Sequence, residues 1–229
     1  VGCTIGCEFC YVAARADMSR RLEGLPCLPW GRYVDVKVNA AEVLRREVRE
    51  YAPGIVRFGP ILTAPYQPLE RRYRITRQCL EVLLEAGFSP VILTRAARVA
   101  EDIGLLCRFP RAAVGLSVPT DDDGVRRKFE PGADPVEERL AVLEQCHAAG
   151  LRTFGVVQPM LPMDPERLAA RMAPFVYSIR IDRMHEMPQA RRLYEQAGML
   201  SAADDSFFTR TGAALRAAFA ARGVGCDEM

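Results

Sequence analysis

Residues 90–118 read PVILTRAARVAEDIGLLCRFPRAAVGLSV, and this stretch decides the fold. It begins with a β-rich run over residues 90–94, continues with a helical pattern over 99–107 and ends with a second β-rich run over 112–118. Parallel strands need a long connection between them, usually a helix. The order strand, helix, strand therefore predicts a parallel pair of strands.

The same alternation extends through the rest of the chain. Further β-rich runs lie at residues 33–38, 55–59, 153–158 and 177–182. Helical patterns cover residues 41–51, 69–86, 135–149, 165–172, 189–197 and 205–221. Residues 19–32 hold three turn-formers and Trp30, and we expect a loop there. Five or six β–α units connected by right-handed crossovers predict an α/β fold that curls into a barrel or part of one.

In such a barrel the functional site lies at the carboxyl ends of the strands. This rule nominates residues before any motif is considered: 59–63, Thr94, Arg95, 117–120, Gln158 and 182–185. By contrast, we expect the acidic run at residues 121–123, closed by Gly124, to be a solvated turn.

The composition limits the function classes. Hydrophobic residues make up 49% of the 229 residues, enough for a sizeable core. The 31 basic and 29 acidic residues leave a net charge of +2, which gives no strong attraction to nucleic acid. The chain has no uninterrupted run of about 18 apolar residues, so the sequence predicts no membrane span. No signal peptide is visible. The chain starts at Val1 rather than Met, and Cys3 follows almost at once, which indicates a fragment.

Eight cysteines are present, and three of them fall within residues 3–10. A secreted disulfide scaffold is usually shorter and denser in cysteine. Cys79, Cys107 and Cys146 lie in apolar helical patterns, and we expect them to be buried thiols. This usage fits a reducing cytoplasm.

The crowded cysteines carry the chemistry, in the sequence CTIGCEFCY over residues 3–11. Thiolates are the natural ligands of iron–sulfur clusters. Gly2 and Gly6 allow the backbone to bend so that three sulfurs can face one cluster. Three cysteines hold three irons and leave the fourth open, as a catalytic site requires. The alternative is a structural zinc site with Cys27 as the fourth ligand.

This spacing, CxxxCxxC followed at once by an aromatic residue, resembles the signature of the radical S-adenosylmethionine (radical SAM) superfamily. Other stretches resemble its spore photoproduct lyase-like branch: KVN at 37–39, TAPYQPLE at 63–70, TRQCLEVL at 76–83, ILTR at 92–95, FEP at 129–131 and ERL at 138–140. The resemblance implies a radical SAM core domain over residues 1–185. The helical patterns beyond it predict a helical C-terminal extension over 186–229. The implied core is a parallel partial (βα)6 barrel whose first strand, before Cys3, is missing.

The resemblance also implies a chemistry. In that superfamily, S-adenosylmethionine chelates the open iron of a [4Fe–4S] cluster, an electron splits the sulfonium, and a 5′-deoxyadenosyl radical abstracts hydrogen. Cys3, Cys7 and Cys10 match the cluster ligands. The chain would then be a cytoplasmic enzyme of the lyase or oxidoreductase type, with an unknown substrate and an electron donor such as flavodoxin or ferredoxin.

Further positions match the family's contacts with S-adenosylmethionine: Tyr11, Gly59, Pro60, Ile61, Leu62, Arg95 and Ser117. The implied contacts are the backbone after the third cysteine with adenine, the 59–62 backbone with the methionine amino group, Arg95 with the methionine carboxylate, and Ser117 with the ribose or methionine moiety. Each has a plainer alternative. Tyr11 could pack on the barrel rim, Arg95 could be a surface charge, and Ser117 could bond to its own backbone.

The chain also departs from the family pattern. Relatives carry Asp at the position of Ala64 and Lys at that of Arg95, while spore photoproduct lyases have a hydrogen-donating cysteine that residues 58–70 lack. We therefore do not expect thymine-dimer repair. Two further hypotheses are an iron–sulfur and S-adenosylmethionine-binding protein without turnover, and a nucleic-acid-associated module. The second would use helical arginines: Arg45, Arg46, Arg49, Arg71, Arg72, Arg74 and Arg77.

Overall fold

The structure is a computed structural model that describes residues 1–59, 62–185 and 187–226. At its centre lies a six-stranded sheet in the order β1-β2-β3-β4-β5-β6, with every pair of neighbours parallel. The strands are β1 (Ile55–Phe58), β2 (Ser89–Thr94), β3 (Ala113–Ser117), β4 (Arg152–Val157), β5 (Ser178–Ile181) and β6 (Gly225–Cys226). β1 and β6 are edges, so the sheet does not close. The predicted parallel α/β fold, as part of a barrel, is confirmed.

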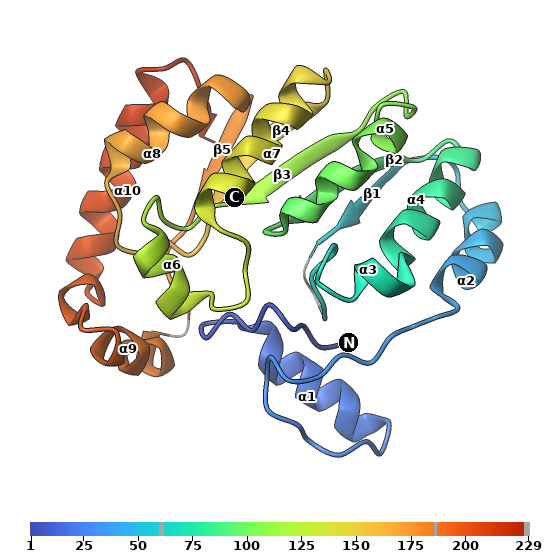
Figure 1. The fold of residues 1–229 in the computed structure, drawn as a ribbon, viewed down its shortest axis with the longest axis horizontal. Helices are drawn as coiled ribbons and strands as arrows, with labels where there is room; N and C mark the ends of the chain where they lie inside the picture. The colour runs from blue at the N-terminus through green and yellow to red at the C-terminus, as the bar shows by residue number, and fades with distance from the viewer. Residues whose placement is uncertain (60–61, 186, 227–229) are drawn as a thin grey trace.

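Helices flank this sheet (Figure 1). The α-helices of the described residues are α1 (Val12–Leu22), α2 (Ala40–Glu47), α3 (Glu70–Tyr73), α4 (Ile75–Glu85), α5 (Ile103–Leu106), α6 (Asp123–Phe129), α7 (Val136–Ala148), α8 (Pro165–Met172), α9 (Met187–Gln196) and α10 (Asp205–Ala220). Short 3-10 turns lie at Val48–Glu50, Ala97–Asp102, Ala173–Phe175 and Leu200–Ala202. α4 packs on β2, α7 on β3 and β4, and α10 on β5 and α8. Below the sheet in Figure 1 lie the N-terminal segment and α1.

The core forms where the apolar faces of sheet and helices meet. Ile92 of β2 and Leu116 of β3 are fully buried, as are Leu83 of α4 and Leu143 of α7. Burying a leucine or isoleucine side chain contributes about 1.5–3 kcal/mol, so these central strands form a rigid support for the residues at their carboxyl ends.

Several local predictions were wrong. Residues 19–22 belong to α1 instead of a loop, because Arg20 pairs with Asp35 and becomes buried. The run at 33–38 forms no strand and contributes only the antiparallel bridge from Val34 to Gly2. The helix expected over 69–86 is divided at Arg74, which has a φ of 51°.

The acidic run at 121–123 is also not a plain solvated turn. The carboxylate of Asp121 is buried against Arg167, and Asp122 accepts hydrogen bonds at the start of α6. Of the cysteines expected to be buried, Cys146 is buried, Cys79 is half-buried and Cys107 is exposed. Cys107 lies outside α5, where the chain turns toward solvent.

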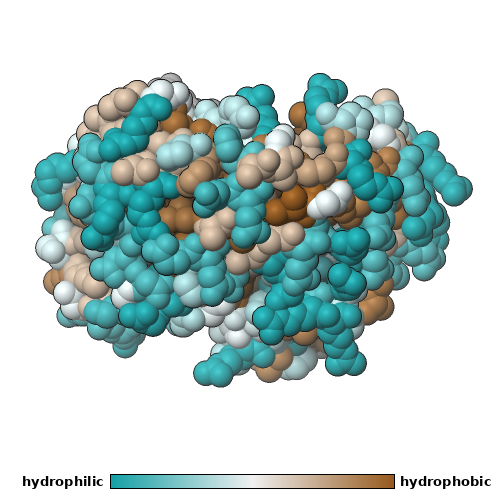
Figure 2. All heavy atoms as spheres, turned by 45° about the horizontal axis from the view of Figure 1, so that its top comes forward, coloured by the Kyte–Doolittle hydropathy of each residue, from teal (hydrophilic) through white to brown (hydrophobic). Residues whose placement is uncertain are grey.

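The predicted C-terminal helices are α9 and α10, and β6 follows them and pairs with β5. The division of the chain at residue 185 stays a prediction. No helix among the described residues has the length and apolar character needed to cross a bilayer. The face shown in Figure 2 is largely hydrophilic, with hydrophobic side chains gathered across its middle.

Candidate active site

The N-terminal loop brings three thiols to one small cavity. Cys3 and Cys7 are buried, Cys10 is half-buried, and all three are free. They line this cavity together with Arg95. Gly2 and Gly6 have φ values of 91° and 61°, in the left-handed region that glycine adopts without strain. The predicted bends of the loop are therefore present.

The TAPYQ stretch at residues 63–67 holds the start of this loop. The Thr63 hydroxyl donates to the Gly2 carbonyl at 2.8 Å. Gln67 donates to the Thr63 oxygen and accepts from the Thr4 N–H at 3.2 Å. The Gln67 side chain is buried, so these bonds are shielded from water. The stretch therefore has a structural role that its sequence alone did not indicate.

A second segment, residues 129–132, supports the loop from the other side. Glu8 N–H donates to the Phe129 carbonyl at 3.0 Å, and Gly132 N–H donates to the Ile5 carbonyl at 3.1 Å. A Cβ atom on Gly132 would lie 2.7 Å from the carbonyl oxygens of both Thr4 and Ile5. Only glycine permits this approach.

Arg95 connects the strand ends to the cysteines. It follows β2 directly, and its guanidinium Nη1 lies 3.2 Å from Cys7 Sγ. Its Nη2 donates to Ser117 Oγ at 3.0 Å, and its Nε lies 3.0 Å from Glu130 Oε1. The side chain is only 18% exposed, so Arg95 is not a surface charge. Arg95 thus contacts two other residues selected from the sequence, Cys7 and Ser117.

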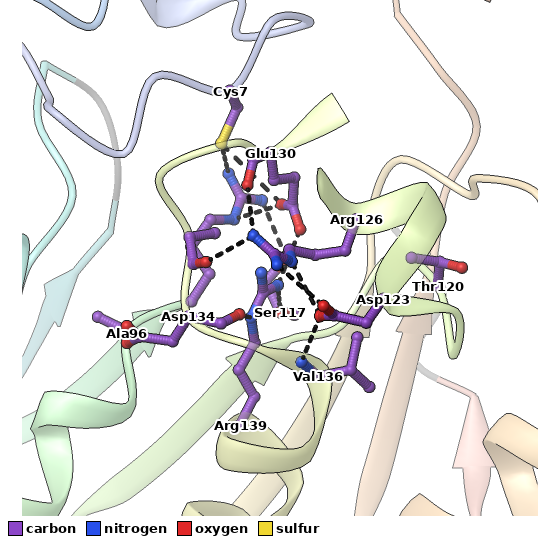
Figure 3. A network of polar contacts seen from close by, with 12 residues as sticks. Cys7, Ala96, Ser117, Thr120, Asp123, Arg126, Glu130, Asp134, Val136 and Arg139 are labelled. Carbon is purple, nitrogen blue, oxygen red and sulfur yellow. Dashed lines mark hydrogen bonds and ion pairs between the residues drawn. The ribbon is translucent and has the colours of Figure 1, made fainter. Parts of the chain in front are cut away.

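Glu130 completes a network that the sequence analysis missed (Figure 3). Its Oε2 accepts from Arg139 Nη1 at 2.9 Å, and both side chains are fully buried. Arg139 Nη1 also donates to the Ser117 carbonyl at 2.9 Å. The available signal was the position of both residues in the FEP and ERL stretches.

Burial governs the protonation of the site. It raises the pKa of the Cys7 thiol to about 12, although the Arg95 charge acts in the opposite direction. It also raises the pKa of Cys10. Burial alone would lower the pKa of Arg95, but the charges of Cys7 and Glu130 raise it, so the guanidinium stays cationic. Metal ligation uses the thiolate and would therefore release protons from these cysteines.

A larger cavity of about 670 Å³ adjoins the cysteine loop. Cys10, Tyr11, Ala64, Arg95 and Ser117 line it, and the far wall comes from the ends of β4 and β5: Gln158, Arg180, Asp182 and His185. This volume is in the range of small-molecule sites. The rule that the site lies at the strand ends is consistent with this lining.

The far wall is internally hydrogen-bonded. Asp182 Oδ2 accepts from Gln158 Nε2 at 3.0 Å and lies 3.1 Å from His185 Nε2. An ionised carboxylate at that distance favours the tautomer with hydrogen on Nε2. The wall therefore presents ordered polar groups toward the cavity.

Other candidate residues are placed less centrally. The Tyr11 side chain is 41% exposed. The Leu62 carbonyl accepts from Gly2 N–H at 2.9 Å, and Gly59 is exposed after β1. Pro60 and Ile61 lie outside the described residues.

The described residues do not group the three thiols around a single metal ion. Among the residues that the structure describes, no three His, Cys, Asp or Glu side chains are grouped to hold one metal ion. Cys27 is exposed, and its sulfur accepts from Arg21 Nε at 3.3 Å, so it is not placed as a fourth ligand with the other three. A cluster binds each thiolate through a different iron, which suits cysteines spread around a cavity.

A parallel α/β sheet with a three-cysteine loop at its strand ends defines a class of metal- and cofactor-binding proteins. Residues 1–172 match the family model of the radical SAM superfamily. The chain belongs to the radical SAM superfamily. Membership implies S-adenosylmethionine and an iron–sulfur cluster as cofactors.

Known proteins agree with this membership. An uncharacterized protein of Methanocaldococcus jannaschii is 23% identical over 177 residues, 76% of this chain and 64% of that protein. The radical SAM Nalpha-GlyT isomerase of Pseudomonas phage M6 is 28% identical over 160 residues, 70% of this chain and 32% of that protein. The chain thus spans less than two thirds of the length of either relative.

A solved structure of a spore photoproduct lyase variant with bound AdoMet and dinucleoside spore photoproduct has a similar fold. It superposes with a TM-score of 0.60 at 18% identity, over 96% of this chain and 72% of that one. At this identity the likeness establishes the fold alone.

Proposed function

We propose that the chain is the core of a radical SAM enzyme in which Cys3, Cys7 and Cys10 hold a [4Fe–4S] cluster. The observation that carries the proposal is the convergence of three free thiols on one cavity beside Arg95. When bound, the cluster and S-adenosylmethionine supply a 5′-deoxyadenosyl radical that abstracts hydrogen from a substrate.

The chain's own residues would bind and orient these groups. Arg95 carries donors for the methionine carboxylate, and the Ser117 hydroxyl lies beside it, 3.0 Å from Nη2. Tyr11 and the 59–62 backbone are proposed to contact adenine and the methionine amino group. Ala64 lines both cavities, so the carboxylate that relatives carry there is replaced by an apolar methyl group.

Burial of the thiols supports the water exclusion that radical chemistry needs. We also propose a reducing, cytoplasmic setting and an electron donor of the flavodoxin or ferredoxin type.

A nucleic-acid-derived substrate is the second candidate. Its support is that one structural neighbour holds a dinucleoside spore photoproduct. The helical arginines that were expected to bind nucleic acid give this candidate little support. Arg74 leaves the helix with a φ of 51°, and Arg77 is paired with Glu81 and Asp102.

The test of the main proposal is anaerobic reconstitution with iron and sulfide. We expect one oxygen-sensitive cluster per chain, and an electron paramagnetic resonance spectrum of the reduced protein that changes when S-adenosylmethionine is added. Dithionite should then release 5′-deoxyadenosine. Cys3→Ala, Cys7→Ala or Cys10→Ala should abolish the cluster, whereas Cys79→Ala should retain it.

Two outcomes would count against this function. Stoichiometric zinc without iron uptake would favour the zinc site. A cluster whose spectrum ignores S-adenosylmethionine would favour a protein without turnover.

A further inference from the structure

A guanidinium lies between a buried carboxylate and a cysteine sulfur. Arg95 Nε lies 3.0 Å from Glu130 Oε1, and its Nη1 lies 3.2 Å from Cys7 Sγ. The same carboxylate oxygen is 4.0 Å from that sulfur. A carboxylate and a thiolate this close would repel each other strongly in a buried setting. The arginine between them turns this repulsion into two attractive contacts.

Two guanidinium groups, those of Arg95 and Arg139, lie against the single carboxylate of Glu130. Arg139 occupies the second carboxylate oxygen of Glu130 at 2.9 Å, and both of these side chains are fully buried. Two arginines therefore share one carboxylate. Buried ion pairs need such hydrogen-bonded geometry to offset desolvation.

The backbone of Glu130 is itself held in place (Figure 3). Its N–H donates to the Arg126 carbonyl at 2.7 Å. Arg126 Nη1 donates to the Ala133 carbonyl at 3.1 Å, and Gly132 N–H donates to Ile5 in the cysteine loop. The carboxylate is thus fixed relative to the loop that it faces, and it can act as an anchor.

Arginine at position 95 suits this role better than a lysine would. A guanidinium has five N–H donors in a fixed fork, whereas an ammonium is a single point of charge. Two nitrogens of Arg95, Nη1 and Nη2, donate hydrogen bonds to Cys7 and Ser117, and Nε forms an ion pair with Glu130 without a hydrogen bond. Lysine could not contact all three with this geometry.

We propose that Glu130 is a positioning residue that holds Arg95 against Cys7, so that an N–H···S hydrogen bond from Arg95 raises the reduction potential of the cluster. The inference rests on the proposed function, because it takes Cys7 as a cluster ligand. Hydrogen bonds to the sulfurs are among the factors that set the potentials of iron–sulfur proteins. They stabilise the more negative, reduced state.

The test is a redox titration of the reconstituted protein without S-adenosylmethionine, followed by electron paramagnetic resonance. Glu130→Asp keeps the charge but withdraws the carboxylate from Arg95. We expect a more negative midpoint potential, shifted in the same direction as for Arg95→Met. The matched control is Asp121→Asn, which alters another buried carboxylate paired with an arginine, Arg167. Its potential should equal that of the unchanged protein.

The double variant separates positioning from charge. If Glu130 acts through Arg95, Glu130→Asp should add no further shift to Arg95→Met. Equal shifts from Glu130→Asp with and without Arg95 would overturn the inference, as would a potential that Arg95→Met does not move.

If Glu130→Asp takes up no cluster, Ser117→Ala can be used instead, because it removes another hydrogen-bond partner of the Arg95 guanidinium. A smaller negative shift is expected there, and an unchanged potential would overturn the inference. Failure of the unchanged chain to bind iron would instead overturn the proposed function, so the two failures are distinct.

Discussion

Gly132 lies directly against Ile5 of the cysteine loop, with its N–H 3.1 Å from the Ile5 carbonyl oxygen and no room for a side chain. A Cβ atom there would meet two backbone oxygens at 2.7 Å, and backbone cannot move aside as a flexible side chain can. The contact joins residues more than a hundred positions apart in the chain. It fixes the distance between the segment that carries Glu130 and the loop that carries the cysteines.

Gly132→Ala should therefore disturb the loop. We expect a loss of about 1–3 kcal/mol in the free energy of unfolding, the usual cost of overpacking, and a lower iron content after reconstitution. Urea unfolding and iron analysis measure the two effects. Gly104→Ala is the matched control, because a Cβ atom there meets nothing within 4 Å and alanine favours α5. Full iron content in Gly132→Ala would contradict the prediction.

Arg95→Ala should weaken the binding of S-adenosylmethionine. A hydrogen bond between charged groups contributes about 1.5–3 kcal/mol, which corresponds to roughly a ten- to hundredfold change in Kd. Iron content should be retained, because Arg95 is not a ligand. Isothermal titration of S-adenosylmethionine into the reconstituted variant gives the affinity.

Arg95→Lys is the informative comparison for this position. It restores the charge but not the fork, so it should recover much of the affinity if charge dominates. An affinity unchanged in Arg95→Ala would remove this residue from the cofactor site.

Gln67→Ala should destabilise the start of the cysteine loop. Its buried carboxamide contacts Thr63 and the Thr4 N–H, so truncation leaves a buried donor without its partner. We expect a loss of about 1–3 kcal/mol in the free energy of unfolding. Gln78→Ala removes an exposed carboxamide that donates to the Tyr73 carbonyl. It should change stability by no more than about 0.5 kcal/mol. Equal effects in the two variants would argue against the proposed role of Gln67.

The features predictable from the sequence were those written in local patterns. The strands from β1 to β5 follow from β-branched runs that end in turn residues, and the cysteine loop follows from its spacing. The features that could not be predicted from the sequence depend on partners that are distant in the chain. Arg20 is buried only because Asp35 reaches it, and Asp121 only because Arg167 lies across the fold.

In the candidate site, too, residues in local patterns were predictable and residues that depend on distant partners were not. Arg95 and Ser117 were selected because strand ends form the site in parallel barrels. Glu130, Arg139 and Gly132 were missed because their roles depend on residues brought close by the folding of α6 and α7. No pattern of spacing in a single sequence reports that Glu130 faces Cys7, 123 residues away.

The free energy of unfolding should depend on pH through the contacts that Asp123 makes at the start of α6. The hydrogen bonds from Arg126 lower the pKa of Asp123 to about 2 from an ordinary value of 3.8. A carboxylate with a lowered pKa in the folded state contributes stability above its unfolded pKa and loses it as the pH falls. The contribution should therefore be complete at pH 6 and decline between about pH 4 and pH 2.

Because the side chain is 34% exposed, we expect Asp123→Asn to cost only about 1 kcal/mol at pH 6. Urea unfolding across this range should show the two proteins converging in stability toward pH 2. Glu137→Gln, at an exposed carboxylate paired with Arg171, should show no such convergence, and a constant difference for Asp123→Asn would contradict the assignment.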